Sequence, residues 1–157
     1  MQYKKGFISV LCLVFLAISG CSSVPMASST QDNQAKLFHT HPEKSNLYIF
    51  RSDKEGSSIK MKLDVDGKYV ATNIGQTYIK LVVDPGKHVI VSHADNNYRL
   101  VLATLKNKNY FIYQDVKVGK VTTRTKLSHV RENVGKQGVI NSVMISSVAF
   151  SPALSMR

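Results

Sequence analysis

Residues 59–67, Ile59-Lys60-Met61-Lys62-Leu63-Asp64-Val65-Asp66-Gly67, alternate between apolar and charged side chains and end in a glycine. Successive side chains of a β-strand point to opposite faces, so this alternation predicts a strand with one face in a core and the other in water. Asp66-Gly67 predicts a tight hairpin turn in which Gly67 takes a positive φ. Residues 68–71 then begin the returning strand.

Short runs rich in Val, Ile, Leu and Tyr lie on both sides of this hairpin. The other predicted strands are 47–51, 78–83, 87–92, 98–105, 110–118 and 120–127. Turn signals recur about every 8 to 12 residues, which is typical of an all-β sandwich or barrel. The sequence therefore predicts a mainly β fold, an antiparallel β-sandwich of about seven strands.

A second turn signal is Asp84-Pro85-Gly86-Lys87. Pro85 presets φ at the second position of a type II turn, and Gly86 accepts the positive φ of the third position. We expect this turn to join 78–83 and 87–92 as a second hairpin.

The C-terminal part of the chain suits an edge strand followed by a short helix. Residues 120–127 alternate between two faces of a strand, one with Lys120, Thr122, Arg124 and Lys126 and the other with Val121, Thr123, Thr125 and Leu127. This pattern predicts an exposed edge strand, because lysines at an edge discourage further strand pairing. Residues 128–136 suit a short helix with Ser128 as N-cap and with Val130 and Val134 facing the sheet. Residues 139–150 suit a strand, a helix or a docked tail equally well.

The N-terminus has the features of a targeting segment. Two lysines, Lys4 and Lys5, precede the uncharged run 7–18, which is shorter than the roughly 20 residues of a membrane-spanning helix. The run ends in Leu16-Ala17-Ile18-Ser19-Gly20-Cys21. These residues resemble the lipobox of bacterial lipoproteins, which implies cleavage between Gly20 and Cys21 and lipid attachment at Cys21.

This reading divides the chain into four parts: a signal peptide (1–20), a lipidated cysteine with a flexible tether (21–45), a β-sandwich domain (46–146) and a C-terminal tail (147–157). The tether is rich in Ser, Thr, Gln and Asn and would span roughly 25 to 30 Å as a random coil. Cys12 lies in the segment to be removed and Cys21 carries the lipid. No disulfide or cysteine metal site is therefore expected.

Two further runs carry a resemblance: Leu63-Asp64-Val65-Asp66-Gly67-Lys68-Tyr69-Val70 and Leu81-Val82-Val83-Asp84-Pro85-Gly86-Lys87-His88-Val89-Ile90-Val91. They are similar to the PEGA and carboxypeptidase-regulatory class of small β-sandwiches. With 47–51, 98–100 and 109–112 they resemble an uncharacterised family of bacterial envelope lipoproteins over about residues 46–135. The resemblance implies a sandwich of two antiparallel sheets and transfers no catalytic residues. The chain departs from the PEGA pattern at 73–76, where Asn-Ile-Gly-Gln replaces Gly-x-Thr-Pro.

The chain is strongly basic, with a formal net charge of +11. In the cell envelope a basic protein meets phospholipid head groups, lipopolysaccharide, teichoic acids or peptidoglycan carboxylates, and nucleic acid is not an expected partner. The candidate surface for an anionic ligand consists of Lys117, Lys120, Arg124 and Lys126. A solvated basic surface without a ligand is the alternative.

No motif commits the chain to a reaction, and we predict no catalytic residue, cofactor or metal site. His39 and His41 have a spacing that could share a metal, but no third ligand is evident. His88 and His93 are five residues apart on one strand and point to opposite faces. We expect His88 to bond a loop carbonyl. The aromatic residues suit either core packing or a glycan platform: Tyr48, Phe50, Tyr69, Tyr78, Tyr98, Tyr110, Phe111 and Tyr113.

Together these patterns indicate a non-catalytic lipoprotein whose β-sandwich is an interaction module of the bacterial cell envelope. It would sit on the outer membrane and face the periplasm if the host has two membranes, since Ser22 and Ser23 follow Cys21 in place of aspartate. The expected partners are the membrane, through the lipid, and an envelope protein. The alternatives are a binding module for lipopolysaccharide or peptidoglycan and, more remotely, an envelope hydrolase.

Overall fold

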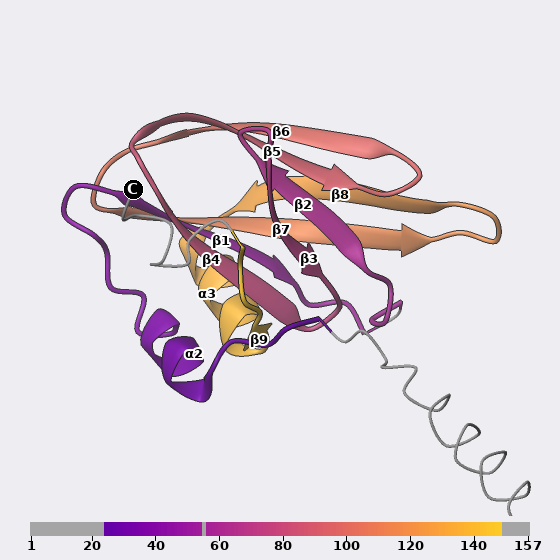
Figure 1. The fold of residues 1–157 in the computed structure, drawn as a ribbon, viewed down its shortest axis with the longest axis horizontal. Helices are drawn as coiled ribbons and strands as arrows, with labels where there is room; N and C mark the ends of the chain where they lie inside the picture. The colour runs from indigo at the N-terminus through magenta and orange to yellow at the C-terminus, as the bar shows by residue number, and fades with distance from the viewer. Residues whose placement is uncertain (1–23, 55, 149–157) are drawn as a thin grey trace, which may run out of the picture.

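The computed structural model describes residues 24–54 and 56–148 and folds them into two facing β-sheets with two helices (Figure 1). The five-stranded sheet has the order β8-β7-β1-β4-β9, and the four-stranded sheet has the order β3-β2-β5-β6. The strands are β1 (Ser45–Arg51), β2 (Met61–Val65), β3 (Lys68–Asn73), β4 (Thr77–Val83), β5 (Gly86–His93), β6 (Asn97–Thr104), β7 (Lys108–Val118), β8 (Thr123–Val130) and β9 (Val143–Met144). The mainly β, two-sheet prediction is confirmed, with nine strands in the described residues instead of about seven.

The central strand of the larger sheet is β1, and all seven of its residues are buried. It pairs antiparallel with β4 and parallel with β7, while β4 pairs parallel with β9. The expectation of purely antiparallel sheets is therefore wrong for these two pairs. Between β1 and β7 the chain forms β2 and β3 in the four-stranded sheet, β4 in the five-stranded sheet, and β5 and β6 in the four-stranded sheet again. No local turn dictates their relative orientation.

The main core lies between the two sheets. It contains alternate residues of the strands, among them Leu47 and Ile49 of β1, Leu63 of β2 and Ile112 of β7. The alternation at 59–66 has the predicted effect: Met61, Leu63 and Val65 are buried and Lys62 is exposed. Apolar burial of this kind is the main favourable contribution to folding.

The hairpin turn at Asp66-Gly67 is confirmed. It joins β2 to β3, and both turn residues have positive φ, 51° at Asp66 and 76° at Gly67. Positive φ at both central positions is what a type I′ turn requires. Asp66 thus also has the positive φ that the sequence predicted for Gly67 alone.

The predicted second hairpin at Asp84-Pro85-Gly86 is wrong. The chain does bend there, and Gly86 has a φ of 148°, but β4 and β5 belong to different sheets. The neighbours of β4 are β1 and β9, whereas β5 pairs with β2 and β6. The turn residues encode a change of direction and do not encode which strand the next segment will pair with.

The outer face of the five-stranded sheet carries a second core. Two helices cover it, α2 (Ser29–Ala35) and α3 (Glu132–Ile140), which lie away from the four-stranded sheet in Figure 1. The buried residues of this second core are Ala35, Tyr48, Phe50, Tyr78, Phe111 and Val139. Four of the eight aromatic residues considered for a glycan platform are thus core residues.

The flexible tether predicted over 22–45 is wrong from residue 24 onward. Val24 is buried in the main core, Met26 bridges Ile145, and Ser28 caps α2. The cap is a capping box, in which the Ser28 side chain accepts from the Gln31 backbone and the Gln31 side chain accepts from the Ser28 N–H. This Ser-x-x-Gln spacing was the sequence signal for a helix in a stretch whose polar composition suggested disorder.

Buried tyrosines hold α2 in place. The Tyr48 hydroxyl donates to Ala35 O at 2.9 Å, and the Tyr78 hydroxyl donates to the Asp32 carboxylate at 2.8 Å. Burial raises the pKa of both tyrosines, and Asp32 raises that of Tyr78 further. A buried hydroxyl without a partner is costly, so this part of the chain must fold onto the sheet.

The short C-terminal helix exists, but it begins later than predicted. Ser128 and Val130 belong to β8, which forms one edge of the larger sheet as expected, and Arg131 is the N-cap. The predicted sheet-facing role of Val134 is wrong, since that side chain is 49% exposed. The buried face of α3 instead carries two glycines, Gly135 and Gly138.

These two glycines allow close packing of α3 on aromatic rings. A Cβ added at Gly138 would lie 2.1 Å from a ring carbon of Phe50, and one added at Gly135 would lie 2.2 Å from Phe111. Such contacts are far inside van der Waals range, so a side chain would have to displace the helix or a buried ring.

We expect Gly138→Ala to destabilise the protein by about 1–3 kcal/mol, because the added methyl overpacks the contact with Phe50. Helix propensity alone predicts the opposite sign, a gain of up to about 1 kcal/mol. Thermal or urea unfolding measures the difference. The exposed position Asn133→Ala on the same helix is the control and should stay within about 0.5 kcal/mol of wild type. A stabilised Gly138→Ala variant would contradict the close packing.

Candidate functional site

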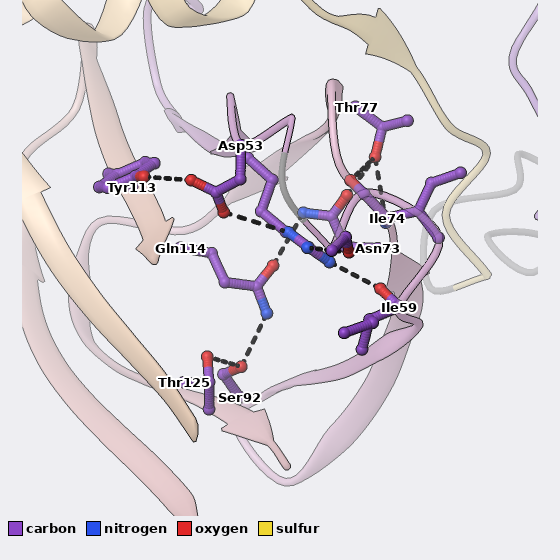
Figure 2. Close-up of polar contacts among 11 residues, drawn as sticks. Asp53, Ile59, Asn73, Ile74, Thr77, Ser92, Tyr113, Gln114 and Thr125 are labelled. Atoms are coloured by element: carbon purple, nitrogen blue, oxygen red, sulfur yellow. Dashed lines mark hydrogen bonds and ion pairs between the residues drawn. The ribbon is translucent and has the colours of Figure 1, made fainter. Parts of the chain in front are cut away.

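A chain of polar side chains crosses the interior between the two sheets (Figure 2). Gln114 of β7 is its centre: its amide oxygen accepts from Asn73 at 2.9 Å, and its amide nitrogen donates to Ser92 at 2.7 Å. Ser92 in turn shares a hydrogen bond with Thr125 at 2.7 Å, and Thr77 donates to Asn73. All five side chains are buried and bonded to one another, so the chain links β3 and β5 of one sheet to β4, β7 and β8 of the other.

Arg51 forms a second buried polar centre, and its partners Asp53 and Ile59 are labelled in Figure 2. Its side chain is fully buried and donates to the backbone carbonyls of Ile59 at 2.7 Å and Gly56 at 3.0 Å. Asp53 lies 3.5 Å from its Nε and accepts from the Tyr113 hydroxyl. Burial lowers the pKa of Arg51 and Asp53 opposes that shift, while burial and Asp53 raise the pKa of Tyr113. These contacts fix the loop that follows β1.

Sequence reasoning did not identify Arg51, Gln114 or Ser92, because a polar residue in a strand has the same local pattern whether it faces water or an interior partner. The groups that meet here are amides, hydroxyls and one ion pair, each directed at another protein group. Among the described residues no three of His, Cys, Asp and Glu come together as metal ligands. The geometry of the interior is that of a structural link between the sheets.

His88 joins the first hairpin turn to the crossover between the sheets. Its Nδ1 lies 2.7 Å from the Asp66 carboxylate, and its Nε2 lies 2.7 Å from Asp84 O. The predicted bond to a loop carbonyl is thus confirmed. Both ring nitrogens face oxygen acceptors, and only a protonated imidazole donates from both. The Asp66 carboxylate also accepts from the Val89 N–H at 2.8 Å.

The electrostatics of this pair favour the charged forms. Burial alone lowers the pKa of His88, but the bonds to Asp66 and Asp84 outweigh it, so the pKa of His88 is raised. For Asp66 burial raises the pKa, and the bonds from His88 and Val89 outweigh it, so the pKa of Asp66 is lowered. A hollow of about 300 Å³ beside the pair is lined by Asp66, Asp84 and His88 and by no serine.

His93 takes the opposite side of β5, as predicted, and its Nε2 lies 2.8 Å from the Asp64 carboxylate. Lys62 lies 3.6 Å from the same carboxylate. Asp66 pairs with His88 instead of a lysine. The two aspartates therefore have separate partners.

The predicted anionic-ligand surface lies on the hairpin formed by β7 and β8. Lys117 is directly opposite Arg124, and Asp115 is directly opposite Lys126, so these four side chains share one face. A hollow of about 260 Å³ is lined by Asn96, Tyr98, Asp115, Lys117, Arg124, Thr125 and Lys126. The structure thus brings three of the four predicted cations together. Lys120 lies apart from them in the loop that connects the two strands.

Two residues of the β5–β6 turn complete this side of the hairpin. The Asn96 amide bonds both the N–H and the carbonyl of Thr125, at 2.8 and 2.9 Å. Asp95 accepts from the Thr123 N–H at 2.6 Å. These bonds occupy backbone groups of Thr123 and Thr125 in edge strand β8, and Tyr98 lines the same hollow as the cations. No sequence signal indicated this contact, because the β5–β6 turn and β8 are far apart along the chain.

The predicted cleavage and lipidation residues, Gly20 and Cys21, lie outside the described residues. Among residues 24–54 and 56–148, no helix has both the length and the apolar character needed to cross a membrane.

Comparison with known proteins finds one relative that extends over most of the chain. It is a protein of Haemophilus influenzae named as an uncharacterized protein, 35% identical over 129 residues, which cover 80% of this chain and 76% of the relative. No family model matches the chain, and no solved structure matches it.

The His88–Asp66 pair predicts a pH dependence of stability. A raised His88 pKa in the folded state adds stability that is fully present below the unfolded value of about 6.5 and is lost as pH rises through the folded value. A lowered Asp66 pKa adds stability that is present above about 3.9 and is lost as pH falls. The pair therefore contributes most between about pH 4 and 6.5.

We expect His88→Asn to cost roughly 1–2 kcal/mol at pH 5.5 and clearly less at pH 9, since Asp66 is partly exposed and the pair is screened by water. Urea unfolding at both pH values measures this. His129→Asn, at an exposed histidine of β8, is the control and should change stability little at either pH. An equal cost of His88→Asn at both pH values would show that the charge on His88 contributes nothing.

Proposed function

The chain belongs to the same family as the Haemophilus influenzae protein, and we propose that it is a lipid-anchored, non-catalytic β-sandwich protein of the bacterial cell envelope. The observation that carries this proposal is Leu16-Ala17-Ile18-Ser19-Gly20-Cys21, which resembles a lipobox and lies just before the first described residue of the fold, Val24. The resemblance to envelope lipoproteins with a PEGA-like domain belongs to the same proposal.

The burial of Val24 in the main core changes what the anchor does. Val24 is three residues after Cys21, and three residues span at most about 11 Å. An acylated Cys21 would therefore hold the domain against the bilayer surface, and not at the end of a long tether. On a host with two membranes we propose the outer membrane, with the domain in the periplasm.

The polar groups of the interior support a non-catalytic role. Gln114, Ser92 and Asn73 bond one another, and both nitrogens of His88 are engaged by protein oxygens. A general base needs a free ring nitrogen directed at substrate. An envelope hydrolase built on His88 would also need a serine in the adjacent hollow, and the residues that line it include none.

The anchor is tested by metabolic labelling with a palmitate analogue in a bacterial host that processes lipoproteins. The full chain should incorporate the label, and Cys21→Ser should incorporate none and keep residues 1–20, because the cysteine is both the acylation site and the first residue after cleavage. Cys12→Ser, a change of the other cysteine of the chain, is the control and should label like wild type. Label on Cys21→Ser, or none on wild type, would contradict the proposal.

A second candidate function is binding of an anionic envelope polymer. The observation that favours it is the hollow beside β8, which is lined by Lys117, Arg124 and Lys126 together with Tyr98. Cations attract carboxylate or phosphate groups, and a tyrosine ring suits the apolar face of a sugar. Asp115 lies among the cations and reduces their net charge.

For this candidate we expect the double variant Arg124→Glu, Lys126→Glu to bind immobilised lipopolysaccharide or peptidoglycan roughly tenfold more weakly than wild type. Binding of wild type should also weaken as salt is raised, because exposed charges are screened. Lys87→Glu, Lys108→Glu has the same net charge and lies elsewhere, on β5 and at the start of β7, so it should retain binding. Equal loss in both double variants would mean attraction by overall charge and no specific surface.

A further inference from the structure

The loop at the tip of the β7–β8 hairpin exposes two apolar side chains. Val121 is 93% exposed and Val118 is 48% exposed. The Gly119 N–H donates to Thr122 O at 2.8 Å, which closes the turn and presents Val121 at its end. Figure 1 shows this hairpin reaching beyond the rest of the domain. A β-branched apolar side chain held in water at a protruding tip has no role in the core.

Cations are the nearest charged residues along the chain on both sides of Val121. Lys117, Lys120 and Arg124 are all exposed, and the sequence has no acidic residue from 116 to 131. The acidic groups near the base of the hairpin have other partners: Asp53 accepts from Tyr113, Asp95 accepts from the Thr123 N–H, and Asp115 is opposite Lys126. The tip itself is therefore apolar at its end and positively charged around it.

This combination matches the surface of an anionic bilayer. Apolar side chains gain by entering the boundary between head groups and acyl chains, while lysine and arginine stay at the level of the lipid phosphates. A soluble polyanion would neutralise the cations but would leave the valines in water. The exposed valines therefore favour a lipid surface over a polymer for this tip.

We propose that the β7–β8 tip, residues 117–124, inserts Val121 into the head-group layer of an anionic membrane and so orients the domain on the bilayer, while Val118, whose methyl group lies against Gly56, stays at the base of the tip. The orienting role rests on the proposed function, because the anchor at Cys21 supplies the high local concentration at which a weak second contact is populated. The insertion itself depends only on the hairpin.

Tryptophan fluorescence tests the insertion, since the chain contains no tryptophan. The Val121→Trp variant is made in the full chain with Cys21→Ser, so that no acyl chain can attach. With vesicles of equal parts phosphatidylglycerol and phosphatidylcholine, its emission should shift to shorter wavelength and be quenched by brominated acyl chains. With phosphatidylcholine alone it should not shift.

Two comparisons make the readout specific to the tip. Leu105→Trp, at a side chain 66% exposed after β6, reports any binding through another part of the chain, such as the apolar run 7–18, and should not shift. Adding Lys117→Glu and Lys120→Glu to Val121→Trp should weaken vesicle binding roughly tenfold or more, because each cation contributes near an anionic surface. Adding Lys87→Glu and Lys108→Glu instead should have a smaller effect.

Three outcomes overturn the proposal. The emission of Val121→Trp does not shift with anionic vesicles, or the emission of Leu105→Trp shifts equally. In the third outcome, the soluble polysaccharide part of lipopolysaccharide shifts the emission of Val121→Trp and vesicles do not. The last outcome would assign the tip to a polymer. Because every variant carries Cys21→Ser, a failure of the acylation experiment leaves this result unaffected, and a failure here leaves the lipid anchor standing.

Discussion

The structure depends on the burial of β1 on both faces. Leu47 and Ile49 face the four-stranded sheet, and Tyr48 and Phe50 face outward. A sandwich of two sheets covers only the first of these faces, so the second needs another layer. Residues 24–44 and 131–141 supply it through α2 and α3. The aromatic residues on that face therefore require the flanking segments to fold, and the polar hydroxyls among them require specific backbone partners.

The interior polar groups are also held by hydrogen bonds to other protein groups. Gln114, Asn73 and Ser92 bond one another across the gap between the sheets, and Arg51 bonds the carbonyls of the loop that follows β1. A buried polar network that is satisfied fixes the relative position of the elements that it joins. The amides and hydroxyls of this network leave little capacity for a ligand. In the Arg51–Asp53 pair, Nε and Oδ2 are buried and face each other at 3.5 Å without a hydrogen bond. The exposed cations and valines of the β7–β8 hairpin lie on the surface.

Folding of the segment before β1 also matters for the proposed lipid anchor. A long flexible tether would leave the domain free to take any orientation, whereas an acylated Cys21 would lie only three residues before the buried Val24. Such a short anchor would restrict the domain to a small set of orientations on a bilayer. Contacts that are weak in solution, such as those of the charged β7–β8 hairpin, would then select among these orientations.

The sequence by itself determined the features that depend on a few adjacent residues. Alternation predicted β2, Asp66-Gly67 predicted its hairpin, and the basic alternation at 120–127 predicted an exposed edge with Arg124 and Lys126 on one face. Tertiary structure decided the rest: that Asp84-Pro85-Gly86 crosses between sheets, that β7 runs parallel to β1, that residues 24–45 fold, and that Asn96 and Tyr98 join the cations. Each of these features depends on which distant segment packs or pairs with the segment in question. Side-chain periodicity and turn propensity are local properties and do not specify that partner. Gly138 shows the difference most directly, because its local effect is to weaken a helix, and only the Phe50 ring beneath it makes a glycine necessary.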